Sequence, residues 1–232
     1  LDLIRKRAAN YEYFFGKLND PEWIAPLWER GLLQNPPPLM RNEKGEIFGA
    51  PAWPPLKFLI RMASKAPKEV LNVALNIETD NYFVMNDLTE AALSMPGAYA
   101  EEWATKLGRW IDKEKFPLGF LEHTVGKLIS HLSKEGYPKN AIKLALSILA
   151  VLPDPKAEGI KISKEHSEKL PFMRLEPQVR LRQYNYEQIL KQNVPDLAKA
   201  VPFETLEVLC TLLETFIMYS MNDAGNQKPK DL

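Results

Sequence analysis

The chain of 232 residues contains a single cysteine, Cys210. One cysteine cannot form an intramolecular disulfide, so the fold has no disulfide framework and suits a reducing compartment. No apolar run approaches the roughly 20 residues that a helix needs to cross a bilayer. The first residues also lack the apolar segment of a signal peptide. These absences predict a cytoplasmic protein that does not span a membrane.

Glycine is scarce, with 11 residues and no cluster among them. A phosphate cradle made of backbone N–H groups needs closely spaced glycines, so a nucleotide-binding loop is not expected. Net charge is absent as well, because 30 basic residues balance 30 acidic ones. Affinity for nucleic acids depends largely on basic side chains that neutralise phosphates, so the balance argues against a dedicated nucleic-acid binder.

No residues converge on a catalytic or metal-binding pattern. His123 and His131 are eight residues apart, about 80° apart around one predicted helix, and His166 has no companion histidine in its charged segment. Cys210 stands among leucines at helical spacing, which predicts a buried, inert thiol. We therefore expect no enzymatic activity, no cofactor and no bound metal.

Proline is frequent, with 19 residues, and many of the prolines stand where a predicted helix begins. The first turn of a helix tolerates proline because its missing N–H would have no intrahelical partner there. The prolines at these positions are Pro21, Pro67, Pro96, Pro138 and Pro202. Each follows the end of the preceding helix after a short break, which predicts a chain of paired helices.

Apolar residues at helical spacing predict helices along most of the chain. The approximate ranges are 2–18, 21–31, 54–64, 67–77, 80–93, 96–112, 117–134, 138–151, 179–192 and 202–221. Two irregular segments separate them, a proline-rich loop at 34–55 and a charged crossover at 156–177. Residues 222–232 form a polar tail. The absence of an initial methionine and the polar end suggest a fragment of a longer protein.

The proline-rich loop at 34–55 is the one long break in the first half of the chain. Three consecutive prolines at 36–38 exclude a helix, and the turn signal Asn42-Glu43-Lys44-Gly45 predicts a small hairpin. Trp53, just before the next helix, is expected to anchor the loop. Loops of this length are usually functional or lie across a neighbouring element.

Residues 80–93, with the sequence D-N-Y-F-V-M-N-D-L-T-E-A-A-L, resemble the inner helix of a HEAT or armadillo repeat. An aspartate stands at the turn, followed by Val84 and then by small and apolar residues, although Met85 replaces the usual basic residue. The resemblance extends over about 54–152 and implies stacked helix pairs. We expect an all-α, right-handed α-α superhelix, a HEAT-like solenoid of four to five helix pairs, forming a single domain at 1–221.

Charge is unevenly distributed along the chain. The segment from Glu69 to Thr105 has seven acidic residues and no basic one, whereas bases outnumber acids from Lys106 to Arg180. Solvated outer faces explain such segregation, and one acidic surface that meets a basic protein partner is the alternative. The candidate interaction surface consists of Glu78, Asp80, Asp87, Glu90, Glu101 and Glu102.

Aromatic and basic residues form a second candidate set. Trp103 and Trp110 are seven residues apart and are expected in the core. Three further tryptophans flank the proline-rich loop and either pin it down or line an exposed groove, while three bases at i, i+4 and i+8 form a stripe that could contact phosphates. The secondary set consists of Trp23, Trp28, Trp53, Lys57, Arg61 and Lys65.

The expected function is that of a non-enzymatic module for protein–protein interaction, a scaffold or sensor within a larger protein. Two alternatives remain open. Some HEAT-like proteins of similar size resemble DNA-repair glycosylases, and such a role would need a basic groove that holds an acidic catalytic residue. A small-molecule enzyme would need a closed pocket lined by Trp23, Trp28 or Trp53 with converging polar groups.

Overall fold

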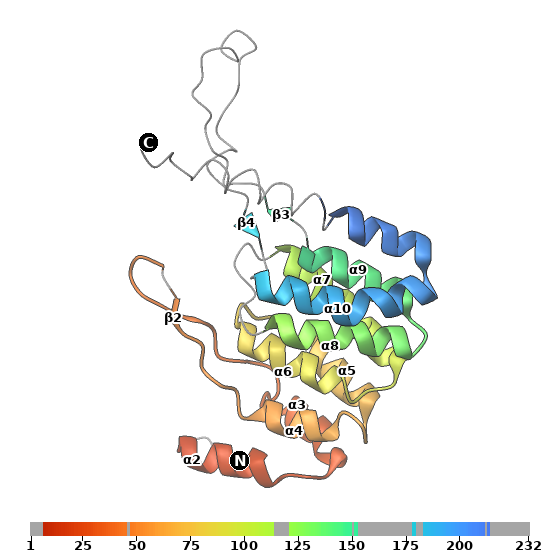
Figure 1. Ribbon diagram of the computed structural model, residues 1–232. Helices are drawn as coiled ribbons and strands as arrows, with labels where there is room; N and C mark the ends of the chain where they lie inside the picture. The colour runs from red at the N-terminus through yellow and green to blue at the C-terminus, as the bar shows by residue number, and fades with distance from the viewer. Residues whose placement is uncertain are drawn as a thin grey trace.

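The computed structural model describes residues 7–45, 47–113, 121–149, 151–152, 178–179, 183–211 and 213. Helices make up most of the described chain, as Figure 1 shows. The predicted crossover at 156–177, the tail at 222–232 and His166 lie outside these residues. The prediction of a mostly helical fold is confirmed.

The helices fall between short connections, as the proline positions predict. Their bounds are α2 (Ala8–Lys17), the 3-10 helix η1 (Pro21–Trp23), α3 (Ile24–Glu29), α4 (Pro55–Met62), α5 (Pro67–Asn76), α6 (Tyr82–Ala92), α7 (Gly97–Lys113), α8 (Leu121–Lys134), α9 (Pro138–Leu149) and α10 (Gln183–Ala200). Residues 202–211 are also helical. Two short antiparallel strand pairs complete the elements, β1 (Met40–Arg41) with β2 (Ile47–Gly49) and β3 (Val151–Leu152) with β4 (Gln178–Val179).

The helices pack in two layers that follow chain order. In one layer α2 contacts α4, α4 contacts α6, α6 contacts α8, and α8 contacts α10. In the other layer α3 contacts α5, α5 contacts α7, and α7 contacts α9. Figure 1 shows the successive even-numbered helices lying one above another. The apolar faces of both layers form one continuous core.

The predicted start and stop signals act as expected at several helix ends. The Asp20 carboxylate accepts a hydrogen bond of 3.0 Å from the backbone N–H of Glu22, which caps η1. Pro67 and Pro138 are the first residues of α5 and α9, whereas Pro96 stands one residue before α7. Gly31 ends the α3 region with a φ of 68°, a left-handed conformation that glycine adopts without strain.

The hairpin predicted within the proline-rich loop is present. Arg41 pairs with Ile47 across the two strands, and Gly45 in the turn has a φ of 80°. Trp53 is buried, in agreement with its expected role as an anchor. The loop is therefore an ordered excursion that begins and ends on the helical core.

The tryptophans of α7 lie inside, as predicted. The indole N–H of Trp103 donates to the hydroxyl of Thr89 at 3.2 Å, and that of Trp110 donates to the carbonyl oxygen of Thr79 at 2.8 Å. On α6 the apolar side chain of Phe83 is exposed. The next two residues of α6 occupy the inward positions instead.

Two predicted helix ends are corrected. The helix expected to reach residue 151 ends at Leu149, and Val151 pairs with Val179 in a short strand. The helix expected to stop at residue 192 continues as α10 through Pro195. Asn193 is buried and hydrogen-bonded to Ser130 of α8, while Pro195 is exposed. Packing of the inward face against α8 thus outweighs the local preference of proline to end a helix.

The prediction of a buried Cys210 is wrong, since its side chain is exposed. Leu206, Leu209 and Leu213 are exposed too, and Phe203 on the same helix is 86% exposed. Val201, Thr205 and Val208 form the inward face instead. The described chain thus packs on the less leucine-rich side of this helix. Within the described ranges, no helix is both long and apolar enough to cross a membrane.

Candidate functional site

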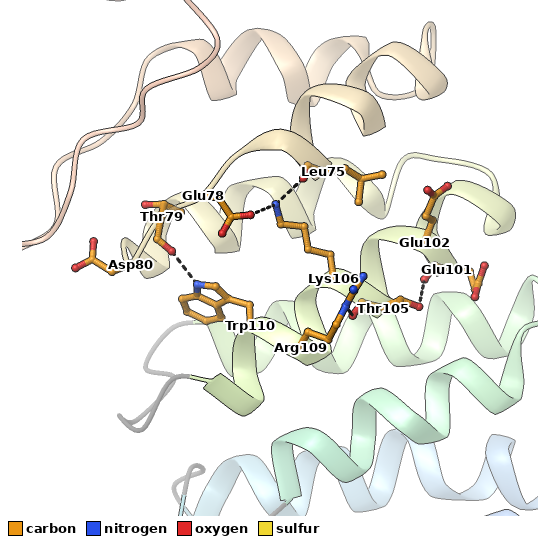
Figure 2. Close-up of a pocket in the computed structure, with 10 residues that line it drawn as sticks. All are labelled: Leu75, Glu78, Thr79, Asp80, Glu101, Glu102, Thr105, Lys106, Arg109 and Trp110. Atoms are coloured by element: carbon orange, nitrogen blue, oxygen red, sulfur yellow. Dashed lines mark hydrogen bonds and ion pairs between the residues drawn. The ribbon is translucent and has the colours of Figure 1, made fainter.

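A cleft of about 850 Å³ lies between α5 and α7. One wall is the C-terminal end of α5 with the segment that leads to α6, and the other wall is α7 (Figure 2). The cleft brings together acidic, basic and apolar side chains. The lining residues are Leu75, Glu78, Thr79, Asp80, Glu101, Glu102, Thr105, Lys106, Arg109 and Trp110.

Lys106 fixes the two walls to each other. Its ammonium group donates to the carbonyl oxygens of Leu75 at 2.8 Å and Ile77 at 2.5 Å, and it lies 3.3 Å from a carboxylate oxygen of Glu78. These carbonyls belong to the end of α5, where unsatisfied C=O groups and the helix dipole favour a cation. The largely buried Lys106 side chain therefore acts as a cap for α5 and not as an open binding group.

Asp80 links the cleft to the hairpin. One carboxylate oxygen accepts a hydrogen bond from the backbone N–H of Leu39, and the other lies 3.2 Å from the guanidinium of Arg41. The neighbouring Thr79 carbonyl accepts the hydrogen bond from Trp110 described above. The segment between α5 and α6 is thus held by α7 on one side and by the hairpin on the other.

The charged groups that remain open in the cleft are Glu102 and Arg109. Within the described part of the chain neither takes part in an ion pair, and Arg109 uses only its Nε–H, which donates to the Thr105 carbonyl at 3.3 Å. Glu101 is partly engaged, because its carboxylate accepts a hydrogen bond of 2.5 Å from the Asn140 amide of α9. The two open groups have opposite sign and are seven residues, or about 10 Å, apart along α7.

The acidic candidate surface is divided by the fold. Four of its members line the cleft, but two of these four face cations, Asp80 with Arg41 and Glu78 with Lys106. Asp87 and Glu90 do not line the cleft, because they belong to α6 in the other layer. Burial raises the pKa of Asp87, an effect that outweighs the hydrogen bond from Asn86. The six carboxylates therefore do not form one continuous face.

The basic stripe on α4 contacts α2. Lys57 forms an ion pair of 2.7 Å with Glu12, which lowers the pKa of that carboxyl. Arg61 donates to the carbonyl oxygens of Phe15 at 2.5 Å and Leu18 at 2.7 Å, at the C-terminal end of α2. Lys65 follows the same pattern, with its ammonium 3.0 Å from the Asn19 side-chain oxygen. These groups hold α2 in place, which leaves little of the stripe for a phosphate ligand.

The three loop-flanking tryptophans do not share a site. Trp53 is buried and Trp23 is exposed, whereas Trp28 lines a smaller cleft of about 450 Å³ between α3 and α5. That second cleft lies in the same helix layer as the larger one. Its remaining lining residues are Ile24, Ala25, Glu69, Asn72, Val73 and Asn76.

The described histidines stand apart, as their spacing predicts. His123 is exposed, and a ring nitrogen of His131 lies 3.0 Å from the Met95 carbonyl oxygen. Among the described residues, no three potential metal-binding side chains lie close enough together to hold an ion.

The sequence prediction missed Thr105, Lys106 and Arg109 as cleft residues. The base-free segment of the sequence ends at Thr105, one residue before the lysine that reaches back to the end of α5. The sequence did contain a signal that these residues lie together. Glu102 and Lys106 are four residues apart, as are Thr105 and Arg109, and this spacing places the two pairs on neighbouring strips of one helix.

Comparison with known proteins adds no further information on this site. No protein-family model, curated protein or solved structure matches the chain.

Proposed function

We propose that the protein is a non-enzymatic module for protein–protein interaction and that the cleft between α5 and α7 is its partner-binding site. In this proposal the two helix layers form a right-handed, HEAT-like superhelix of four to five helix pairs. Helix pairs stacked in this way offer extended surfaces to other proteins. A role as a scaffold or sensor within a larger protein is consistent with such a surface.

The proposal is supported by the way in which side chains of α7 hold the two walls of the cleft together. Lys106 and Trp110 bond its two walls together, so the cavity exists before any partner arrives. A preformed site avoids the free-energy cost of ordering its walls on binding. Glu102 and Arg109 offer charges of both signs at its surface, which supports recognition of a partner that itself carries both signs.

The nucleic-acid alternative finds less support in the same contacts. The most regular group of bases in the sequence contacts α2, and Lys106 of the cleft forms an ion pair with Glu78. A mobility-shift titration at low salt tests this alternative directly, since phosphate contacts are strongest there. Binding that weakens steeply with added salt would favour it over the proposed function.

Affinity purification with quantitative mass spectrometry tests the proposed function. The bait proteins are the wild type, a Thr105→Trp variant that fills the cleft, and a Lys127→Glu control on the exposed side of α8. We expect a set of proteins to be retained by the wild type and the control and to be lost with Thr105→Trp. Equal recovery with all three baits would contradict the proposal, provided that circular dichroism shows equal folding.

A further inference from the structure

The hairpin presents an apolar surface. Phe48 is 65% exposed, Met40 46% and Ile47 37%, all within two very short strands. Figure 1 shows this hairpin extending away from the stacked helices. Large apolar side chains exposed on an ordered, projecting element are typical of a contact surface for another macromolecule, and Phe48 is the most exposed of the three.

The hairpin and the cleft adjoin each other through Asp80. This residue lines the cleft and also binds Arg41 and the backbone of Leu39. In Figure 2 the two arms of the hairpin pass beside the Asp80 end of the cleft. A partner on the hairpin would therefore meet this end of the cleft first.

The order of charges along the cleft follows from α7. Trp110 binds Thr79, next to Asp80, so the C-terminal half of α7 is the end nearest the hairpin. Arg109 lies at this near end, and Glu102 lies about two helical turns further away. Starting from the hairpin, the surface thus offers an apolar patch, then a positive group and then a negative group.

We propose that the hairpin and the cleft together bind one extended polypeptide segment of complementary order. The segment carries an apolar residue for the hairpin, an acidic residue for Arg109 and a basic residue for Glu102. An extended chain in the polyproline II conformation rises about 3.1 Å per residue and completes a turn in three residues. An acid at position i and a base at position i+3 therefore lie on the same side, close to the distance of about 10 Å between Arg109 and Glu102 along α7. This inference rests on the proposed function and specifies the chemistry of the partner.

The two kinds of contact contribute differently to binding. Exposed ion pairs add little affinity but discriminate against partners whose charges are in the wrong order. Burial of large apolar side chains supplies most of the binding free energy at protein interfaces. We therefore expect Phe48 to govern the affinity and the pair Glu102 and Arg109 to govern the choice of sequence.

A phage-displayed library of random twelve-residue peptides, selected on the intact chain, provides the probes. We expect the selected peptides to share the order apolar residue, acid, base, read in either chain direction, with the acid and the base three residues apart. Fluorescence anisotropy then gives the dissociation constant of each labelled peptide. Phe48→Ser should weaken binding by about tenfold or more, and Glu102→Arg or Arg109→Glu by about two- to fivefold each.

A charge exchange makes the test specific. The double variant with Glu102→Arg and Arg109→Glu should bind a peptide whose acid and base are exchanged better than it binds the original peptide. A Glu29→Arg variant, at an exposed position on α3 outside both surfaces, should bind like the wild type. Thermal unfolding of each variant excludes loss of the fold as the cause of weaker binding.

Several outcomes would overturn the inference. Selection of peptides that lack the charge pattern would overturn it. Equal affinity of the double variant for the original and the charge-exchanged peptide would also overturn it. An unchanged affinity after Phe48→Ser would overturn it as well. Dimerisation in sedimentation velocity that Phe48→Ser abolishes would assign the hairpin to a second copy of the chain instead. In each of these cases the affinity-purification experiment still tests the proposed function separately, because proteins retained by the wild type and lost with Thr105→Trp would support it. Failure of the peptide inference can therefore be told apart from failure of the proposed function.

Discussion

The side-chain amide nitrogen of Asn81 lies 2.9 Å from the carbonyl oxygen of Pro37, 44 residues earlier in the chain. The same nitrogen lies 3.0 Å from the Pro51 carbonyl oxygen, and the side-chain oxygen accepts a hydrogen bond from the backbone N–H of Phe83. Asn81 is fully buried. One amide thus joins both arms of the proline-rich loop to the first turn of α6.

Replacement of Asn81 tests this connection. Asn81→Ala removes a helix cap and leaves two carbonyl groups without their donor, so we expect a loss of about 3 kcal/mol in the free energy of unfolding. Asn81→Asp keeps the cap acceptor but not the donor, so it should also destabilise the protein. Urea unfolding measures both effects, and trypsin should cleave faster after Arg41 and Lys44.

The matched control for this experiment is Asn76→Ala at the exposed end of α5, where the amide bonds only to the carbonyl one turn earlier. Its effect should stay within about 0.5 kcal/mol. Equal stability of the two alanine variants would contradict the role of Asn81.

Arg61 and Lys57 distinguish two kinds of charged contact. Arg61 donates to carbonyl oxygens at the end of α2 in a half-buried setting, whereas Lys57 and Glu12 form an exposed pair. Arg61→Ala should cost about 2 kcal/mol, and Lys57→Ala less than about 0.5 kcal/mol. Denaturant unfolding measures the two losses. If Lys57→Ala lowered the free energy of unfolding as much as Arg61→Ala or more, the distinction between the two contacts would be refuted.

Gly97, the first residue of α7, lies in close contact with the next helix pair. A Cβ atom there would come within 2.6 Å of Glu135 Cβ and 2.7 Å of the Tyr137 ring. Gly97→Ala should therefore lower stability by about 2 kcal/mol. Gly16→Ala in α2, where nothing lies within 4 Å, should leave stability unchanged or raise it by up to about 1 kcal/mol. Thermal unfolding compares the variants, and a tolerated Gly97→Ala would show that α7 and the 135–137 turn pack less closely.

The Asp87 carboxyl is expected to make the stability of the protein depend on pH. Because burial raises its pKa in the folded state, the ionised form carries a penalty that is present above that pKa. Asp87→Asn should therefore raise the free energy of unfolding at pH 7, because the amide carries no charge to desolvate. The gain should shrink as the pH falls toward about 4, where the unfolded aspartate also becomes protonated.

Urea unfolding between pH 4.5 and pH 7 checks the Asp87 prediction. Glu43→Gln, at the exposed hairpin turn, serves as the control and should show no such trend. A gain from Asp87→Asn that grows on acidification would contradict a raised pKa of this carboxyl in the folded protein.

Cys210 is the exposed thiol of the last described helix. An aromatic disulfide reagent should modify it in the native protein within about tenfold of the rate in denaturant. A Cys210→Ser, Val208→Cys double variant places the thiol on the buried face, where modification should be at least about a thousandfold slower because local opening must precede it. Similar slow rates for both proteins would show that another part of the chain covers Cys210.

The elements that depend on local interactions could be predicted from the sequence. Apolar periodicity and helix-starting prolines indicated α4 to α9, and the turn signal indicated the hairpin. The interior position of Trp103 also followed from its spacing. These features depend on residues within a few positions of one another, which is the range over which propensity and periodicity act.

The charge pairing at the candidate site could not be predicted. The acidic segment is free of bases along the sequence, yet Lys106 reaches Ile77 across 29 residues and Arg41 reaches Asp80 across 39. The basic stripe on α4 likewise contacts α2 through Arg61, which is 46 residues from Phe15. Which charges neutralise each other depends on helix stacking, and no local pattern encodes it.

The sequence by itself thus determined where the helices and the hairpin form, since backbone hydrogen bonding and apolar spacing are local. Only the tertiary structure decided which surfaces remain open. Helix packing turned Leu206, Leu209 and Leu213 outward and divided the acidic residues between two layers. It also left Glu102 and Arg109 as the open charges of the cleft, because burial and charge pairing depend on which distant helices meet.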